Sequence, residues 1–249
     1  MSRLPRRAAA ATFLRSFLIQ GSWNYHTMLG TGFGFALLPS FRRLFADDAG
    51  RMRVAVSRHL EHFNAHPYLT DVALGAVLTL EEEGEDPETI RRFKVAVRGP
   101  LGAIGDALVW ASWLPLVSLA AVAAFRLDLS PGSVVLSFLV LYNLGHLALR
   151  IWGFRAGRRA GRAVGRTLEQ VHFPRWIELL RSAGSLVLGV LAGTVLVGRG
   201  GLAEAGAGWG AVGVAAFVVG LVAGQRVWRP AAVVIVALVA LLSTLGLMG

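Results

Sequence analysis

Polar residues that could bind a small ligand gather between Arg58 and Asp106. The stretch RHLEHFNAHPY (58–68) holds three histidines, Glu61 and Asn64, and the stretch GPLGAIGD (99–106) ends on an aspartate. Both stretches adjoin apolar segments. Ionisable groups at or near bilayer depth are costly, so where they occur they commonly mark a functional site. Transporters place such sites in helices that Gly and Pro interrupt. We therefore expect a binding site in this part of the chain.

The histidines are open to three interpretations. If residues 59–66 form a helix, His59, His62 and His66 share one face, and histidines one turn apart can bind zinc. A hydrolytic zinc motif would need a Glu between His62 and His66, which is missing, and we predict no metal. The other interpretations are a half-helix whose polar groups are satisfied by neighbours, or the lining of a ligand pathway. Pro67 restricts the residue before it to extended backbone, which predicts that the helix ends at His66.

Carboxylates follow an apolar piece at 68–80 that carries Asp71. Glu81 is the one we predict to be buried or paired, whereas Glu83, Glu85 and Glu88 are expected to face solvent. The acidic run could instead dock a basic soluble partner.

Glycines recur every third residue before Asp106, at 99, 102 and 105. This spacing fits a close helix–helix seam. It also fits a broken helix that turns Asp106 towards a polar cavity. A charge at depth needs a partner, and Arg98 or a group on another subunit could provide one.

The composition indicates an integral membrane protein. Of 249 residues, 55% are apolar, and the 30 glycines suit close helix packing in lipid. The net charge is +10, but the arginines cluster beside apolar segments, as the positive-inside rule describes, so we expect no nucleic-acid partner. The absence of cysteine excludes disulfides and thiolate sites.

We expect an all-α integral membrane protein with two parts. Residues 1–99 form a cytoplasmic region that begins with an amphipathic helix, which lies in the membrane interface. Re-entrant or broken helices follow, because the apolar piece at 27–41, which Pro39 and the arginines after it end, is too short to span the membrane. Residues 100–249 form the transmembrane region. About five spans are expected there, at 100–125, 132–152, 183–198, 210–228 and 231–248.

Arginine placement predicts the topology. The region before residue 100, the connector 150–181 and the turn 226–229 are all basic, and five spans put them on one side of the membrane. The positive-inside rule then places the N-terminus in the cytoplasm and the C-terminus outside.

Five motifs, in order, resemble the enzyme IID subunit of the mannose/fructose/sorbose family of the bacterial phosphotransferase system. They are QGSWNY (20–25), RHLEHFNAHPY (58–68), TLEEE (79–83), GPLGAIGD (99–106) and YNLGHLALRIWGF (142–154).

The resemblance implies a multi-pass subunit that pairs with enzyme IIC to form a sugar pathway, in a trimer of IIC–IID pairs. Separate IIA and IIB subunits phosphorylate a hexose or amino-sugar substrate, so the chain itself would carry no catalytic residue and no cofactor. Candidate substrate-binding residues supply amides, carboxylates, an imidazole and an aromatic face. They are Trp23, Asn24, Glu61, Asn64, His66 and Asp106.

The sequence departs from the family pattern at three places. Arg98 replaces an apolar residue before the GP pair, Trp113 stands where a basic residue is usual, and the region 167–205 is shorter. These departures leave open an alternative function, a regulatory or structural paralogue that has lost transport. A metal-dependent membrane enzyme built on the histidines is a further rival.

Overall fold

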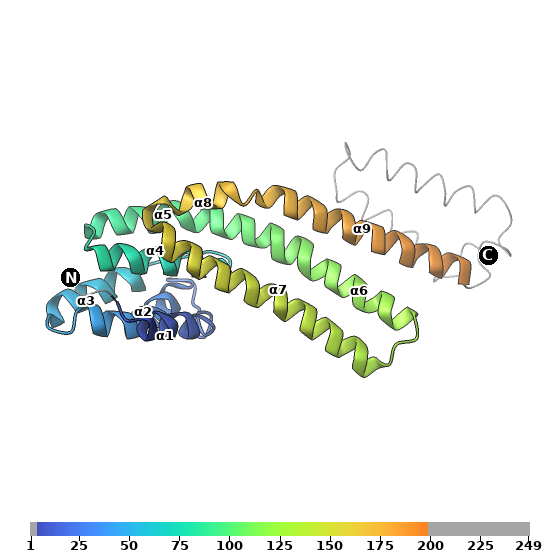
Figure 1. Cartoon of the computed structure of the whole chain (residues 1–249), viewed down its shortest axis with the longest axis horizontal. Coiled ribbons are helices and arrows are strands. Elements are labelled where there is room, and N and C mark those ends of the chain that lie inside the picture. The colour runs from blue at the N-terminus through green and yellow to red at the C-terminus, as the bar shows by residue number, and fades with distance from the viewer. Residues whose placement is uncertain (1–3, 199–249) are drawn as a thin grey trace. The chain divides into compact units, whose positions relative to one another are not determined.

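The structure, a computed structural model, describes residues 4–198, and this part of the chain is helical (Figure 1). No β-strand occurs among these residues, which confirms the all-α prediction for them. The helices are α1 (Arg6–Ser16), α2 (Gly30–Leu44), α3 (Ala49–Leu60), α4 (Thr70–Glu83), α5 (Pro87–Gly105), α6 (Leu114–Arg126), α7 (Pro131–Ala160), α8 (Val164–Gln170) and α9 (Phe173–Gly198). The contacts described below lie within one compact unit, residues 1–187.

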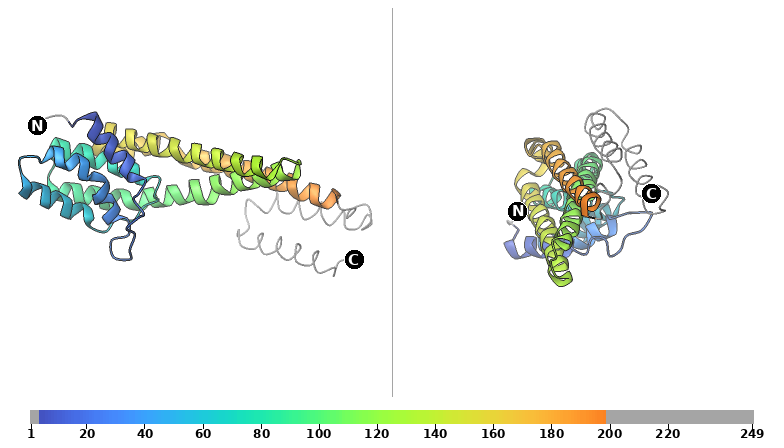
Figure 2. Two further views of the ribbon diagram at one scale, coloured as in Figure 1. Left: turned by 90° about the horizontal axis from the view of Figure 1, so that it is seen from below. Right: turned by 90° about the vertical axis from the view of Figure 1, so that its right-hand side faces the viewer.

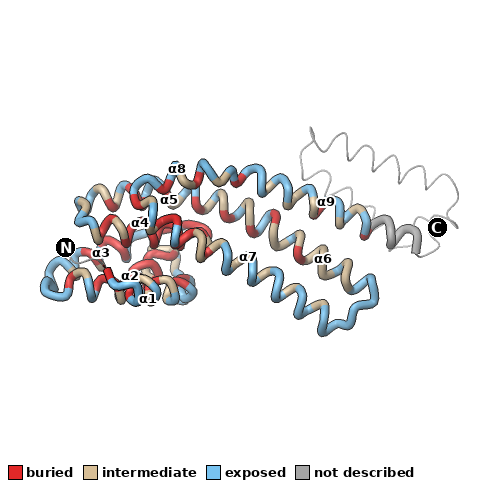
Figure 3. The backbone as a smooth tube through the Cα atoms, in the orientation of Figure 1, coloured by how far each residue is buried: buried red, intermediate tan, exposed pale blue. Residues whose placement is uncertain are grey.

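The core of this unit is built from the short helices at the N-terminal end. Phe33, Leu37 and Phe41 on α2 are completely buried, since α2 packs against α1, α3 and α4. In Figure 3, buried residues (red) are most frequent in these helices. Most of the apolar piece at 27–41 forms α2, which contains Pro39 and ends at Leu44, just after Arg42 and Arg43.

Helix α4 is the most enclosed element and crosses α7 closely. A Cβ at Gly75 would clash with the Phe154 carbonyl, and a Cβ at Gly157 would clash with the Val72 carbonyl. The two backbones therefore meet at glycine on both sides, as in closely packed membrane helices.

Two long, largely continuous helices extend from this core. In the first, α5 passes through a π-helix (Asp106–Trp113) into α6. In the second, α7 passes through a 3₁₀ turn (Gly161–Ala163) into α8. Helices α6 and α7 pack against each other (Figure 2). Among the described residues, Pro87–Arg126 and Pro131–Gln170 are long and apolar enough to cross a membrane. They contain the spans predicted at 100–125 and 132–152.

The remaining spans stay predictions. Helix α9 begins at Phe173, well before the segment predicted at 183–198, so Glu178 and Arg181 lie within the helix. The segments 210–228 and 231–248 lie outside the described residues, and the count of five spans is untested. The boundary expected at residue 100 falls inside α5, and the division into a cytoplasmic and a transmembrane region also remains a prediction.

Candidate functional site

A cavity of about 500 Å³ brings together three segments that are far apart in the sequence. The first is the loop after α1, the second the loop between α3 and α4, and the third the second half of α5. The lining residues are Gln20, Trp23, Leu29, Asn64, Ala65, His66, Pro67, Arg98, Gly99, Gly102, Ala103 and Asp106. Four of the six predicted substrate-binding residues are among them: Trp23, Asn64, His66 and Asp106.

The loop between α3 and α4 presents Asn64 and His66 to this cavity. Helix α3 ends at Leu60, so the helix predicted to continue to His66 was wrong. Instead, the Phe63 backbone joins the loop before α2, because Leu29 N–H donates to its carbonyl (2.9 Å) and its own N–H donates to the Thr27 carbonyl (3.1 Å). The buried Phe63 ring then packs on Phe33, with centroids 4.7 Å apart. Backbone pairing and an aromatic anchor thus fix a loop that no helix supports.

The early end of α3 also changes the histidine interpretation. His59 is inside the helix and completely buried, whereas His62 lies in the exposed loop. The three histidines therefore do not share a helical face, which removes the geometry that suggested zinc. Among the described residues, no group of three His, Asp or Glu side chains could hold a metal ion.

His66 is held tightly between the loop and α5. Its ring lies so close to Gly105 that a Cβ there would clash with it, and Trp110 packs beside it, with centroids 5.1 Å apart. Tyr68 N–H donates to Nδ1 (3.2 Å), and Nε2 is buried without a hydrogen-bond partner among residues 4–198. Burial lowers the pKa of His66 to about 4, so the imidazole is neutral and Nε2 can pair with a hydroxyl.

Asp106 lies at the junction where α5 becomes a π-helix. The wider turn is marked by Ser112 Oγ–H, which donates to the Ala107 carbonyl (2.6 Å) five residues earlier. The helix is wound differently here but not broken, so the broken-helix prediction was wrong in form. Asp106 is exposed and lines the cavity. Short π-helices inside α-helices frequently occur at functional sites.

Arg98 lines the same cavity but does not pair with Asp106. Its Nη1 atom contacts His62, 3.1 Å from Nδ1 and 3.4 Å from the backbone carbonyl. Within the described part of the chain, no side chain pairs with Asp106. The cavity thus holds a carboxylate that is open to hydrogen bonding.

Asn24 and Glu61, the other two candidates, do not line the cavity. The Asn24 amide donates to Thr27 Oγ1 (2.7 Å) and its Oδ1 accepts from the Thr27 N–H (2.9 Å). Glu61 is exposed and pairs with Arg91 (2.9 Å). Both side chains hold local structure next to the site.

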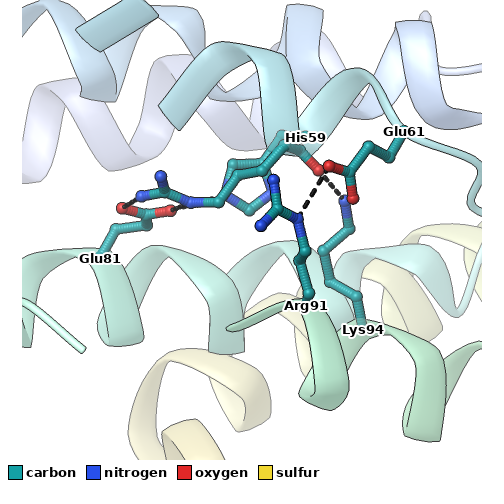
Figure 4. Close-up of polar contacts among 6 residues, drawn as sticks. His59, Glu61, Glu81, Arg91 and Lys94 are labelled. Carbon is teal, nitrogen blue, oxygen red and sulfur yellow. Dashed lines mark hydrogen bonds and ion pairs between the residues drawn. The ribbon is translucent and has the colours of Figure 1, made fainter. Parts of the chain in front are cut away.

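A buried cluster of charged residues anchors the end of α3 (Figure 4). Arg58 Nε–H donates to Glu81 Oε1 (2.8 Å), a second Arg58 N–H donates to Oε2, and His59 Nε2 lies 2.6 Å from Oε1. Lys94 donates to the Arg58 carbonyl (2.7 Å). The prediction that Glu81 is buried and paired is confirmed. The cluster ties α3 to α4 and α5, and so holds two of the three segments that line the cavity.

Burial and hydrogen bonding together set the protonation states of His59 and Glu81 in this cluster. Desolvation lowers the pKa of His59 to about 4, despite the hydrogen bond to Glu81. Burial alone would raise the pKa of Glu81, but the hydrogen bonds from His59 and Arg58 outweigh it and lower the pKa. A neutral His59 therefore donates to an ionised Glu81, which Arg58 neutralises.

A second polar system, which sequence reasoning missed, links α4 to α7. Asp71 Oδ2 lies 2.8 Å from Arg150 Nε, and Arg150 also donates to Ser16 Oγ (2.8 Å). One and two turns before Arg150, His146 stacks on Tyr68 (centroids 3.8 Å) and the Tyr142 and Tyr68 hydroxyls meet at 2.9 Å. The four-residue spacing of Tyr142, His146 and Arg150 was the available signal, because it puts all three on one helical face.

Comparisons with known proteins agree with this architecture. Residues 3–198 match the sequence profile of the PTS system mannose/fructose/sorbose family IID component. The mannose-specific EIID component of Escherichia coli K12 is 33% identical over 196 residues, covering 76% of this chain and 68% of that protein. The fructose permease IID component of Bacillus subtilis is 29% identical over 197 residues, covering 76% and 70%.

A solved structure is similar as well. It is a cryo-electron microscopy structure of the mannose transporter ManYZ in complex with microcin E492. The match has a TM-score of 0.61 and 32% sequence identity, and it covers 77% of this chain and 71% of the matched chain. These matches place the chain among the membrane proteins of the sugar phosphotransferase system. Within that class, it belongs to the mannose/fructose/sorbose family of IID components.

Proposed function

We propose that the chain is the IID membrane subunit of a mannose-family sugar permease, and that with an enzyme IIC subunit it forms the path of the sugar. One observation carries the proposal for the site. In a member of this family, a cavity collects Trp23, Asn64, His66 and Asp106 from three separate segments.

The chemistry of the cavity suits a sugar. Its volume of about 500 Å³ falls in the range of small-molecule sites. The Asn64 amide can donate and accept, and Asp106 accepts. Because Nδ1 of the neutral His66 ring accepts from Tyr68, its Nε2 carries the proton and can donate. Arg98 adds donors, and Trp23 offers a half-exposed aromatic face. Hydroxyl groups need such directional partners, and no catalytic group is required, because the phosphoryl group would come from soluble IIA and IIB subunits.

The partner assignment rests on the relatives. The ManYZ structure is that of a mannose transporter, and its similarity to this chain supports a membrane complex with IIC. A trimer of IIC–IID pairs in the inner membrane follows from the family resemblance, as does a hexose or amino-sugar substrate. We place the N-terminus in the cytoplasm and the C-terminus outside. A reporter that is active only in the cytoplasm, fused after Gly249 and found active, would overturn this topology.

The test is uptake of labelled hexoses in cells that co-express the chain with its IIA, IIB and IIC subunits. We expect Asn64→Ala and Asp106→Asn to reduce uptake by about 10-fold, because the first removes an amide from the cavity and the second replaces a charged acceptor oxygen with a donor. Asn143→Ala and Asp128→Asn are matched controls. Asn143 is exposed on α7 and bonds to the Leu139 carbonyl of its own helix, and Asp128 is exposed in the turn before α7.

Co-purification of IIC with each variant separates a binding defect from lost assembly. Wild-type uptake in both cavity variants would refute the site. An assembled wild-type complex that transports no sugar would favour the alternative, a paralogue that has lost transport.

A further inference from the structure

A second cavity, of about 780 Å³, lies along the end of α7, the 3₁₀ turn and α8. It is larger than the cavity proposed for the sugar, and the proposed function makes no use of it. Its floor includes the apolar residues Ala148, Ile151 and Trp152. Three arginines line it further along the chain, Arg155, Arg159 and Arg166, and no acidic residue is among the lining residues.

The arginines of α7 and α8 fall into two groups. Arg150 pairs with Asp71 (2.8 Å) and Arg158 pairs with Glu82 (2.8 Å), so the arginines that face α4 are neutralised by protein. By contrast, Arg155, Arg159 and Arg166 are exposed, and none of them forms an ion pair or hydrogen bond with the described residues. The cavity therefore gathers three uncompensated positive charges.

The position of the cavity along α7 matches the edge of a bilayer. No Asp, Glu, Lys or Arg occurs from Pro131 to Leu149, a length of about 28 Å at the helical rise. This is close to the thickness of the hydrocarbon core, about 30 Å. Ala148, Ile151 and Trp152 therefore lie where the hydrocarbon ends, and the three arginines lie at the level of lipid phosphates. Trp152 is a residue type enriched at this interface.

We propose that this cavity binds one anionic phospholipid. Its phosphate contacts Arg155, Arg159 and Arg166, because guanidinium groups bind phosphate oxygens in pairs of hydrogen bonds. The first part of an acyl chain lies against Ala148, Ile151 and Trp152. Basic pockets beside membrane-spanning helices bind lipid headgroups by the same physics. The proposal rests on the membrane nature of the family and does not depend on the sugar site.

The test uses the full chain, purified in detergent and stripped of native lipid. Native mass spectrometry then follows the binding of dioctanoyl phosphatidylglycerol, dioctanoyl phosphatidylcholine and inorganic phosphate. The variant replaces Arg155, Arg159 and Arg166 with Gln together. The matched control replaces Arg42, Arg43 and Arg53, which are also exposed, with Gln, so both proteins lose the same charge.

We expect one phosphatidylglycerol to bind at least about 10-fold more tightly than phosphatidylcholine, and the cavity variant to lose at least about 10-fold while the control binds as wild type. Equal affinity for the two lipids, or equal loss in variant and control, would overturn the proposal. So would inorganic phosphate that binds as tightly as phosphatidylglycerol, because the site would then serve free phosphate. If the triple variant does not fold, Arg159→Gln against Arg53→Gln makes the same comparison.

Discussion

Helix α4 and the first half of α7 are both apolar, but they are covered in different ways. Leu74 and Leu78 on α4 are completely buried by neighbouring helices. On α7, Leu136 and Leu144 keep 62% and 58% of their surface exposed. Large apolar side chains that the protein leaves uncovered indicate contact with lipid or with another subunit. High hydropathy therefore indicates only that a helix is shielded from water. Whether protein or lipid covers the helix depends on the neighbouring elements.

The two helices also differ in the charges that they carry. Helix α4 contains Asp71 and Glu81, both buried and both paired with arginine. The first half of α7 contains no charged residue before Arg150. A helix surrounded by protein can carry a charge because a neighbour supplies the opposite one, whereas lipid supplies none.

Removal of the charge on Glu81 has the largest expected effect. Glu81→Gln leaves Arg58 as a buried cation without its counterion, and breaking such a pair costs about 3–5 kcal/mol of unfolding free energy. Denaturant titration of the purified chain in detergent measures this cost. Glu83→Gln, two residues away and exposed, should change the free energy by less than about 0.5 kcal/mol. Similar costs for both substitutions would mean that the Glu81 carboxylate is not stabilised by its pairing with Arg58.

Truncation of one leucine on each helix tests the comparison directly. Leu74→Ala removes a fully buried side chain from α4 and should cost about 2–5 kcal/mol. Leu144→Ala removes a side chain that is largely exposed on α7, and its cost should be below about 1 kcal/mol in the same titration. An equal loss at Leu144 would show that protein, not lipid or detergent, covers this face of α7.

The smallest expected effect is a dependence of stability on pH. His59 has a pKa of about 4 in the fold, against 6.5 for an ordinary histidine, so the unfolded chain binds a proton that the folded chain does not. The contribution of His59 to the unfolding free energy is fully present above pH 6.5 and is lost as the pH falls towards 4. It amounts to at most about 3 kcal/mol. The lowered pKa of Glu81 acts in the same direction below pH 4.5.

Unfolding measured at pH 7 and pH 5 checks this expectation. The His59→Asn variant should lose the part of this difference that comes from His59 and keep the part that comes from His66, whose pKa is also about 4. His26→Asn, at an exposed histidine, should keep the whole difference. A pH dependence that survives unchanged in His59→Asn would assign it to other groups.

Two features could be predicted from the sequence, because each depends on residues that are close together in the chain. The apolar segments within 87–126 and 131–170 became the two long helices. Glu81 was predicted to be buried because it directly follows an apolar piece, and the structure confirms this. The end of α3 could not be predicted in the same way. The Pro67 rule pointed to His66, but the pairing of Phe63 with the loop before α2 stops the helix at Leu60.

The sequence by itself determined the class of the protein, its family and a short set of polar candidates. Composition, arginine placement and motif order are properties of the chain that need no contact between distant residues. Only the tertiary structure decided which candidates meet. It placed Trp23, Asn64, His66 and Asp106 at one cavity, and it joined Asp71 to Arg150. These contacts link residues many helical turns apart, and such contacts depend on how whole helices pack, which periodicity along the chain does not encode.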